Sequence, residues 1–231
     1  MSWVNSRWLG HLGAAAFLVV AAGTGIAAAG DGGKGPIDNP DEHLSFEERD
    51  QKYHDSWDTF ERRYEEWFKS PHAAVDPRTV PRGDVMALQL PGADTFAEAV
   101  DRAALAVLGR VISVRFEPLK TVTEFAVDRH AIGEVGEVLS FVQGGGLWPE
   151  PGFIGATLVE RAGNPILLDG DQAVLLLDRD KDGALSIQPF SGQYRIADGK
   201  TKSVKLNRFR EADGLTADQL MDRIEAQAAR G

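Results

Sequence analysis

Carboxylates at alternate positions of the stretch DRDKDGALS have the types and spacing that could hold a calcium ion. Asp178, Asp180 and Asp182 offer oxygen ligands, and a glycine follows where a calcium loop turns sharply. Ser186 adds a hydroxyl oxygen. A helix–loop–helix calcium site also needs a bidentate acid at its twelfth position, and Pro189 stands there. That type of site is rejected, and a calcium site between strands, completed by another segment, stays a hypothesis.

The same stretch has a second interpretation as the tip of a β-hairpin. Apolar runs, QAVLLL before it and LSIQPF after it, are typical of strands. Asp182 and Gly183 between two strands are a hairpin signal, and Arg179 and Lys181 offset the acidic charge. The sequence therefore favours a turn over a metal site.

Little else in the chain has the pattern of a catalytic site. His130 follows Asp128 and Arg129 near a strand end, where it is either a general base or a surface histidine. The chain has no cysteine, which excludes disulfides, a thiolate nucleophile and cysteine-ligated metals. We predict no enzyme and no cofactor other than calcium. A hydrolase with a carboxylate pair stays an alternative, since such a pair needs no local motif.

The formal net charge of -10 disfavours nucleic acid as a partner, because an acidic surface repels phosphates. The N-terminus indicates export. Arg7 precedes an uncharged run over residues 12–29, which ends in three alanines. Residues 1–29 are therefore predicted as a signal peptide or a membrane anchor. The protein is expected to be secreted, or anchored to the cytoplasmic membrane with its C-terminal domain outside.

Residues 30–44 have the composition of a flexible linker, and residues 45–70 that of an amphipathic helix. Ser45 and Glu48 have capping-box spacing. Five aromatic residues then follow at intervals of four and three. They are Tyr53, Trp57, Phe60, Tyr64 and Trp67. This stripe either packs on the domain or binds another protein. A proline-rich loop is expected over residues 71–92.

The sequence pattern over residues 93–210 predicts a β domain. A short helix capped by Asp94 comes first, and alternating segments such as ISVRFEP, with Ile112 facing inward, and TVTEFAVD follow. Asp198 and Gly199 mark a two-residue hairpin. A helix begins near Thr216 within residues 211–231. We predict a mainly β fold with flanking helices, built on a small antiparallel OB-like barrel.

Four segments follow one another in the order VLGRVISVRFEP, TEFAVDRHAIGEVGEVLSFVQGGG, LLDGDQAVLLLD and PFSGQYRIADGK. This layout resembles that of small exported bacterial proteins of actinobacterial type with an OB-like barrel. The layout is also similar to netrin-like inhibitory modules. Those modules are rich in disulfides and begin with a functional cysteine, which this chain lacks. The resemblance implies a fold and an exported location, and it supplies no catalytic residue.

Two functions follow as hypotheses. One is a non-enzymatic binding module of the cell envelope, with an unknown protein or ligand bound at the rim loop GGGLWPEPGF. Trp148 and Phe153 would then be the contact aromatics, unless they only pack on the barrel. The other is a structural envelope protein that acts through its aromatic helix.

Overall fold

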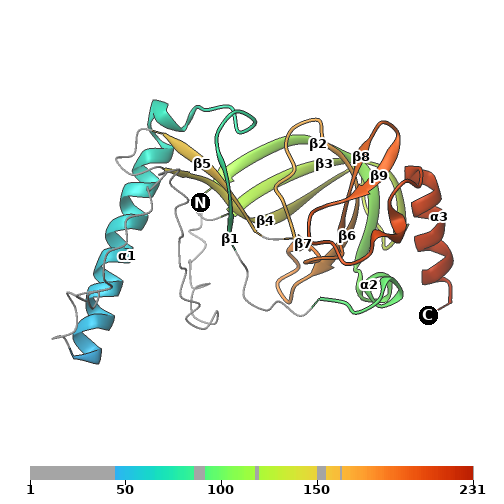
Figure 1. The fold of residues 1–231 in the computed structure, drawn as a ribbon, viewed down its shortest axis with the longest axis horizontal. Helices are drawn as coiled ribbons and strands as arrows, with labels where there is room; N and C mark the ends of the chain where they lie inside the picture. The colour runs from blue at the N-terminus through green and yellow to red at the C-terminus, as the bar shows by residue number, and fades with distance from the viewer. Residues whose placement is uncertain (1–44, 86–91, 118–119, 150–154, 162, 231) are drawn as a thin grey trace, which may run out of the picture.

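Five strands close into a small barrel at the centre of the molecule, with a long helix at one end and two shorter helices at the other (Figure 1). The computed structural model describes residues 45–85, 92–117, 120–149, 155–161 and 163–230. The predicted signal or anchor and the predicted linker lie outside these residues. The strands are β1 (Arg82–Val85), β2 (Leu105–Glu117), β3 (Lys120–Ile132), β4 (Val138–Pro149), β5 (Ala156–Arg161), β6 (Gln172–Arg179), β7 (Leu185–Ile187), β8 (Gln193–Ala197) and β9 (Lys200–Ser203). The α-helices are α1 (Phe46–Phe68), α2 (Phe96–Arg102) and α3 (Ala217–Ala228).

The barrel closes in the order β2–β3–β4–β7–β6 and back to β2. Four of these pairings are antiparallel, and β4 pairs with β7 in parallel through Val142 and Ser186. The prediction of an OB-like barrel with flanking helices is confirmed. The prediction of an antiparallel barrel is wrong in one respect, because the sheet is mixed. The described strands form two parallel pairings, the second between β1 and β5.

Gly109 lets β2 and β3 approach closely at a shift in their register. A Cβ at this position would lie 1.9 Å from the carbonyl oxygen of Ala126 and 2.8 Å from Phe125. Only glycine fits such a contact, which is typical of a glycine inside a strand where another backbone approaches closely. Another shift falls between Val111 and Ser113, so Ile112 has no partner in the register. Ile112 is 45% exposed and does not face inward, contrary to the prediction from alternation.

The glycine run at residues 144–146 lies inside β4, so the predicted rim loop does not begin there. At this run β4 exchanges its partner β3 for β5. A Cβ on Gly145 would lie 2.3 Å from the carbonyl oxygen of Val159 on β5. β5 in turn pairs with β1, which lies within the segment expected as a proline-rich loop. The barrel is therefore extended by a small second layer of β4, β5 and β1.

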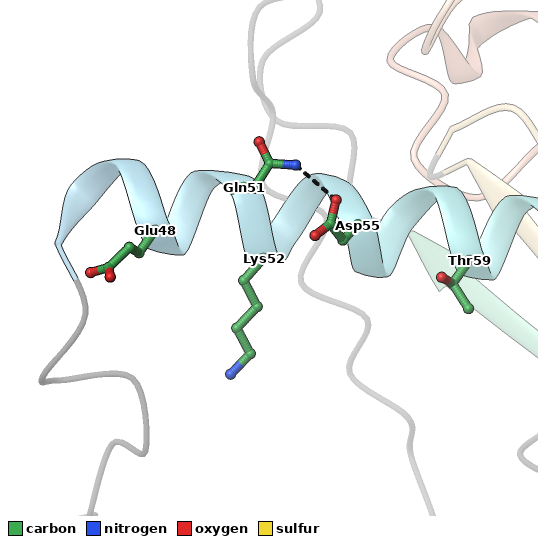
Figure 2. A pocket seen from close by; sticks show the side chains of 5 residues that line it. All are labelled: Glu48, Gln51, Lys52, Asp55 and Thr59. Carbon is green, nitrogen blue, oxygen red and sulfur yellow. Dashed lines mark hydrogen bonds between the residues drawn. The ribbon is translucent and has the colours of Figure 1, made fainter.

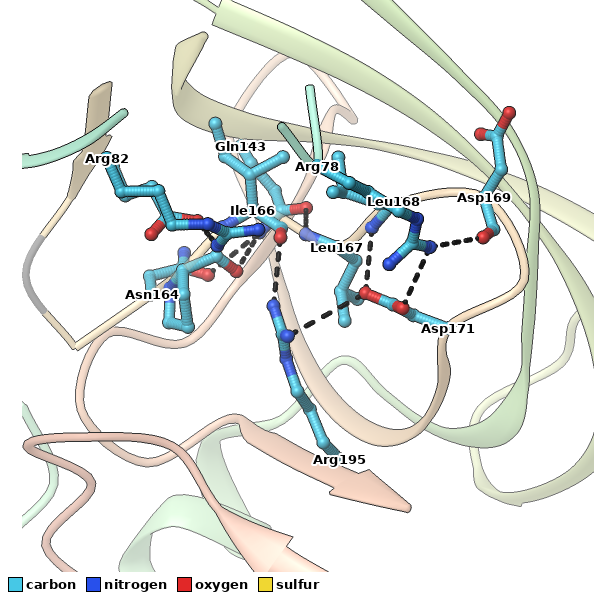
Figure 3. A network of polar contacts seen from close by, with 12 residues as sticks. Arg78, Arg82, Gln143, Asn164, Ile166, Leu167, Leu168, Asp169, Asp171 and Arg195 are labelled. Carbon is cyan, nitrogen blue, oxygen red and sulfur yellow. Dashed lines mark hydrogen bonds and ion pairs between the residues drawn. The ribbon is translucent and has the colours of Figure 1, made fainter. Parts of the chain in front are cut away.

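Residues 164–168, here called the strap, connect β5 to β6 without forming a strand. Their three apolar side chains, from Ile166 to Leu168, are almost fully buried. An irregular buried segment must find partners for its backbone groups elsewhere. In the strap these partners are side chains, as Figure 3 shows.

Gln143 of β4 makes three of the hydrogen bonds to the strap. Its Nε2 donates to Asn164 Oδ1 and to the carbonyl oxygen of Pro165, each at 3.1 Å. Its Oε1 accepts from the Leu167 backbone N–H, also at 3.1 Å. On the other side, Arg195 of β8 donates to the carbonyl oxygen of Ile166 at 2.9 Å. The strap thus spans the space between β4 and β8.

Acidic side chains accept from two further strap N–H groups, those of Ile166 and Leu168. Glu160 Oε1 accepts from the Ile166 N–H at 3.0 Å and from Arg82 at 2.9 Å. Asp171 Oδ2 accepts from the Leu168 N–H at 2.9 Å. Glu160 is only 5% exposed, so its ion pair with Arg82 compensates the cost of burying a carboxylate.

α1 docks on the second layer by its C-terminal half. The capping box of Ser45 and Glu48 is present, as predicted. Tyr64 and Trp67 of the aromatic stripe are buried against Leu147 and Leu158. The Tyr64 hydroxyl donates to the Leu147 carbonyl oxygen. Packing on the domain is confirmed for these two residues, and the side chains at 53, 57 and 60 lie outside the described part of the helix.

α2 and α3 cover the outer surface of β2, β6 and β8. Leu220 and Ile224 of α3 are fully buried there, and the predicted capping box at Thr216 is present. Arg129 of β3 donates to Asp222 at 2.7 Å and to Glu225 at 2.9 Å, which fastens α3 to the barrel. These hydrogen bonds raise the pKa of Arg129 above its ordinary value.

The cap of α2 is Thr95, not the predicted Asp94. The Thr95 hydroxyl accepts from the Glu98 backbone N–H at 3.1 Å. Asp94 instead donates its own N–H to the Glu98 carboxylate at 2.7 Å. A hydroxyl and a carboxylate cap equally well, so the sequence could not separate the two neighbouring residues.

Candidate functional site

The proposed calcium residues lie on a β-hairpin. β6 pairs with β7 in antiparallel order, with Asp178 opposite Ser186, which confirms the predicted turn. Asp180 Oδ1 accepts from the backbone N–H groups of Asp182 and Ala184, at 2.9 and 2.8 Å. This arrangement holds the turn without a metal ion.

Asp178 lies apart from that turn. Its Oδ1 accepts from Gln188 Nε2 at 2.8 Å. Within the described residues, no group of three or more histidine, aspartate or glutamate side chains is arranged to hold a metal ion. Calcium binding at Asp178, Asp180, Asp182 and Ser186 stays a prediction.

His130 lies exposed on β3, opposite Val107 of β2. The hydrogen bonds around this part of β3 are those of Arg129 to α3. A role of His130 as a general base stays untested.

Trp148 lies near the end of β4, where its ring is 5.7 Å from that of Tyr64. It is half-buried and packs with the cluster that receives α1. Phe153, its predicted companion, lies outside the described residues. For Trp148 the geometry corresponds to packing between α1 and the second layer.

A shallow pocket of about 630 Å³ lies along the N-terminal half of α1 (Figure 2). Its lining residues are Glu48, Gln51, Lys52, Asp55 and Thr59. All five come from a single helix, and Gln51 donates to Asp55 at 2.8 Å. Side chains of one helix do not converge on a ligand, so these five residues do not form a reactive centre by themselves.

The outer surface of β2, β3 and β4 is the best candidate for a functional surface, and we call it the open face. Its centre, on β3, consists of Val122, Glu124 and Ala126, which are half-buried or exposed. The alternate residues of β3 face the barrel interior. They are Thr121, Thr123 and Phe125, each with 0% exposure. The two sets follow from the two-residue period of a strand.

Two large aliphatic side chains are exposed on the open face. Ile112 is 45% exposed, and Val138 is 53% exposed. Val138 lies opposite Ala126 in the register of β3 and β4, and Ile112 lies at the bulge on the other side of β3. Two strand spacings separate them by about 10 Å.

Polar groups surround these aliphatic residues. Ser113 donates to Glu124 at 2.7 Å across β2 and β3, and Ser140 lies opposite Glu124 on β4. Arg115 lies opposite Val122. The open face therefore mixes exposed aliphatic side chains with polar groups, a combination that protein–protein interfaces also contain.

Aromatic residues of the barrel strands point away from the open face. Phe125 and Phe141 stack edge to face inside the barrel, with ring centroids 6.0 Å apart. Single-stranded nucleic acids bind through exposed aromatic platforms, which these residues do not provide. Sequence reasoning missed the open face, because Ile112 was assigned to the core by alternation.

No family model matches the chain, and no curated protein was found to match it. None of the helices in the described residues is long and apolar enough to cross a membrane.

Proposed function

We propose that the chain is a non-enzymatic binding module of the cell envelope that takes a partner protein on its open face. The observation that carries this proposal is the exposure of Ile112 and Val138 on a barrel surface that α2 and α3 leave uncovered. Burying two aliphatic side chains in a complex is favourable, and on the free protein they remain in water.

The barrel topology supports the same surface. OB-type barrels bind their ligands on the face of the second and third strands, which correspond here to β3 and β4. This support is an analogy between folds, since many functions share one fold. The net charge of -10 and the aliphatic character of the face favour a protein over a nucleic acid.

The test is affinity capture from envelope extracts with the full chain as bait. The double variant Ile112→Asp and Val138→Asp should lose the partner that the unchanged protein retains. Leu206 is 48% exposed outside the open face, so Leu206→Asp is the matched control. Equal capture by the double variant and by Leu206→Asp would refute the proposal.

The second candidate is contact through α1. One observation favours it, since the N-terminal half of α1 projects away from the barrel (Figure 1). Removing the whole helix would expose the surface that Tyr64 and Trp67 cover, so a deletion of residues 45–58 is the cleaner variant. Loss of the partner in that deletion, with retention in the open-face double variant, would assign the contact to α1.

A further inference from the structure

A small polar cavity lies beside the strap, away from the open face. It has a volume of about 220 Å³. Its lining residues are Gly170, Asp171, Gln172, Arg195 and Ile196. Gly170 and Asp171 lead into β6, Gln172 is its first residue, and the other two belong to β8. One cationic side chain, Arg195, therefore lies in the wall of a cavity large enough for a small polar group.

Arg195 is incompletely hydrogen-bonded. Its Nη2 donates to the Ile166 carbonyl oxygen at 2.9 Å. Its Nη1 lies 3.8 Å from Asp171 Oδ2, which is too long for a hydrogen bond. Its Nε is enclosed and has no partner. A guanidinium group has five N–H donors, so most of those on Arg195 are unused.

Burial makes these unused donors costly. The Arg195 side chain is only 33% exposed, and desolvation lowers its pKa from the ordinary value. Arginine nevertheless stays protonated in proteins. A partly desolvated cation without enough hydrogen-bond partners is stabilised by any anion that reaches it.

Asp171 neutralises Arg195 only in part, because its carboxylate oxygens also have other partners. Its Oδ2 accepts from the Leu168 N–H at 2.9 Å, and its Oδ1 lies 3.3 Å from Arg78. Glu160, the other nearby acid, is paired with Arg82 at 2.9 Å. Three arginines and three acids gather here, with Asp169 exposed at the edge of the cluster (Figure 3). The Asp171 carboxylate that pairs with Arg195 is shared with Arg78 and the strap.

We propose that this cavity binds one carboxylate group, held by Arg195 Nη1 with the side-chain amide of Gln172 at its edge. A carboxylate has the charge opposite to that of Arg195, and its oxygens can accept from the guanidinium donors that the protein leaves unused. The inference is independent of the open face, because no residue of the cavity belongs to that surface. The carboxylate comes either from a small molecule or from a peptide.

Isothermal titration of the full chain with acetate, at constant ionic strength set with chloride, tests the site. Acetate should bind with one-to-one stoichiometry, and Arg195→Lys should weaken it, because lysine cannot reproduce the guanidinium geometry. Asp171→Asn should tighten binding by about two- to fivefold, because it removes a like charge beside the ligand. Asp101 is exposed on α2, so Asp101→Asn makes the same change in net charge as Asp171→Asn away from the cavity and should leave binding unchanged.

The opposite response of the two site variants separates binding from folding, since a misfolded variant cannot gain affinity. A peptide with a free C-terminal carboxylate is then compared with its amidated form. If the free peptide binds more tightly than acetate and amidation removes this difference, the site is assigned to a peptide terminus. If the free peptide and acetate bind with equal affinity, the site is assigned to a small carboxylate. Weaker or unchanged binding by Asp171→Asn, undiminished binding by Arg195→Lys, or an equal gain in Asp171→Asn and Asp101→Asn would overturn the proposal.

Discussion

Gln143 is the side chain on which the strap depends most, and its replacement by leucine is the most informative perturbation of the fold. The residue is fully buried and makes three hydrogen bonds, to Asn164, Pro165 and Leu167. Leucine has a similar volume, so Gln143→Leu removes the hydrogen bonds and leaves little empty space.

The magnitude follows from the groups that lose a partner. The Leu167 N–H and the Pro165 carbonyl oxygen are backbone groups beside fully buried side chains, and each costs about 1–3 kcal/mol when left unsatisfied. The apolar side chain recovers part of this loss inside the barrel. We expect a net decrease of about 3 kcal/mol in the free energy of unfolding. A domain of ordinary stability, about 5–15 kcal/mol, stays folded after such a loss.

Urea unfolding followed by tryptophan fluorescence measures the change, since Trp67 is buried in the native state. The midpoint should fall while the slope stays constant. Ser140 lies on the same strand but on the exposed face, so Ser140→Ala is the control and should change stability by less than about 0.5 kcal/mol. A decrease below about 1 kcal/mol in Gln143→Leu would refute the view that this side chain satisfies the strap.

Three further predictions concern other elements. Gly109→Ala should destabilise the barrel by more than about 3 kcal/mol in the same urea assay, because its Cβ would meet the Ala126 carbonyl oxygen; a small effect would mean that β2 can shift freely. Hydrogen bonds from the Ser45 backbone N–H, and then from its hydroxyl, lower the pKa of Glu48 from its ordinary 4.5. The cap should therefore be intact above pH 4.5, the ordinary pKa of glutamate, and should be lost as the pH falls through the lowered pKa of Glu48. Helicity measured by circular dichroism should decrease over the same pH range, and Glu48→Gln should remove this decrease. Calcium at millimolar concentration should raise the melting temperature if the hairpin binds it, and Asp180→Asn should abolish the rise; no shift in the unchanged protein would end the calcium hypothesis.

Features that depend on neighbouring residues were predicted correctly from the sequence. The caps at Ser45 and Thr216 are formed by residues three positions apart, so no distant contact can change them. The turn at Asp198 is equally local, with Asp198 at φ 52° and the following glycine at φ 70°. The alternation of TVTEFAVD matches the buried Thr123 and Phe125 because β3 is regular in its central part.

Features that depend on distant partners were missed. β1 has the sequence RGDV, without alternation, and it exists through a parallel pairing with β5 more than 70 residues away. The glycines at 144–146 indicated a loop, but they permit close approach of β4 to β5. The polar cluster of Gln143 and Arg195 around the strap has no sequence signature, since its members come from separate strands and a connection.

Because α1 docks on the second layer by its C-terminal end, this contact also determines where the N-terminal end of the helix lies. Tyr64 and Trp67 fasten the last turns of the helix, and its 23 residues extend for about 35 Å. A rigid rod held at one end acts as a spacer with a fixed direction. Any structure attached at Ser45 is therefore kept away from the barrel, and the direction of the helix relative to the barrel is set by the packing of two aromatic rings.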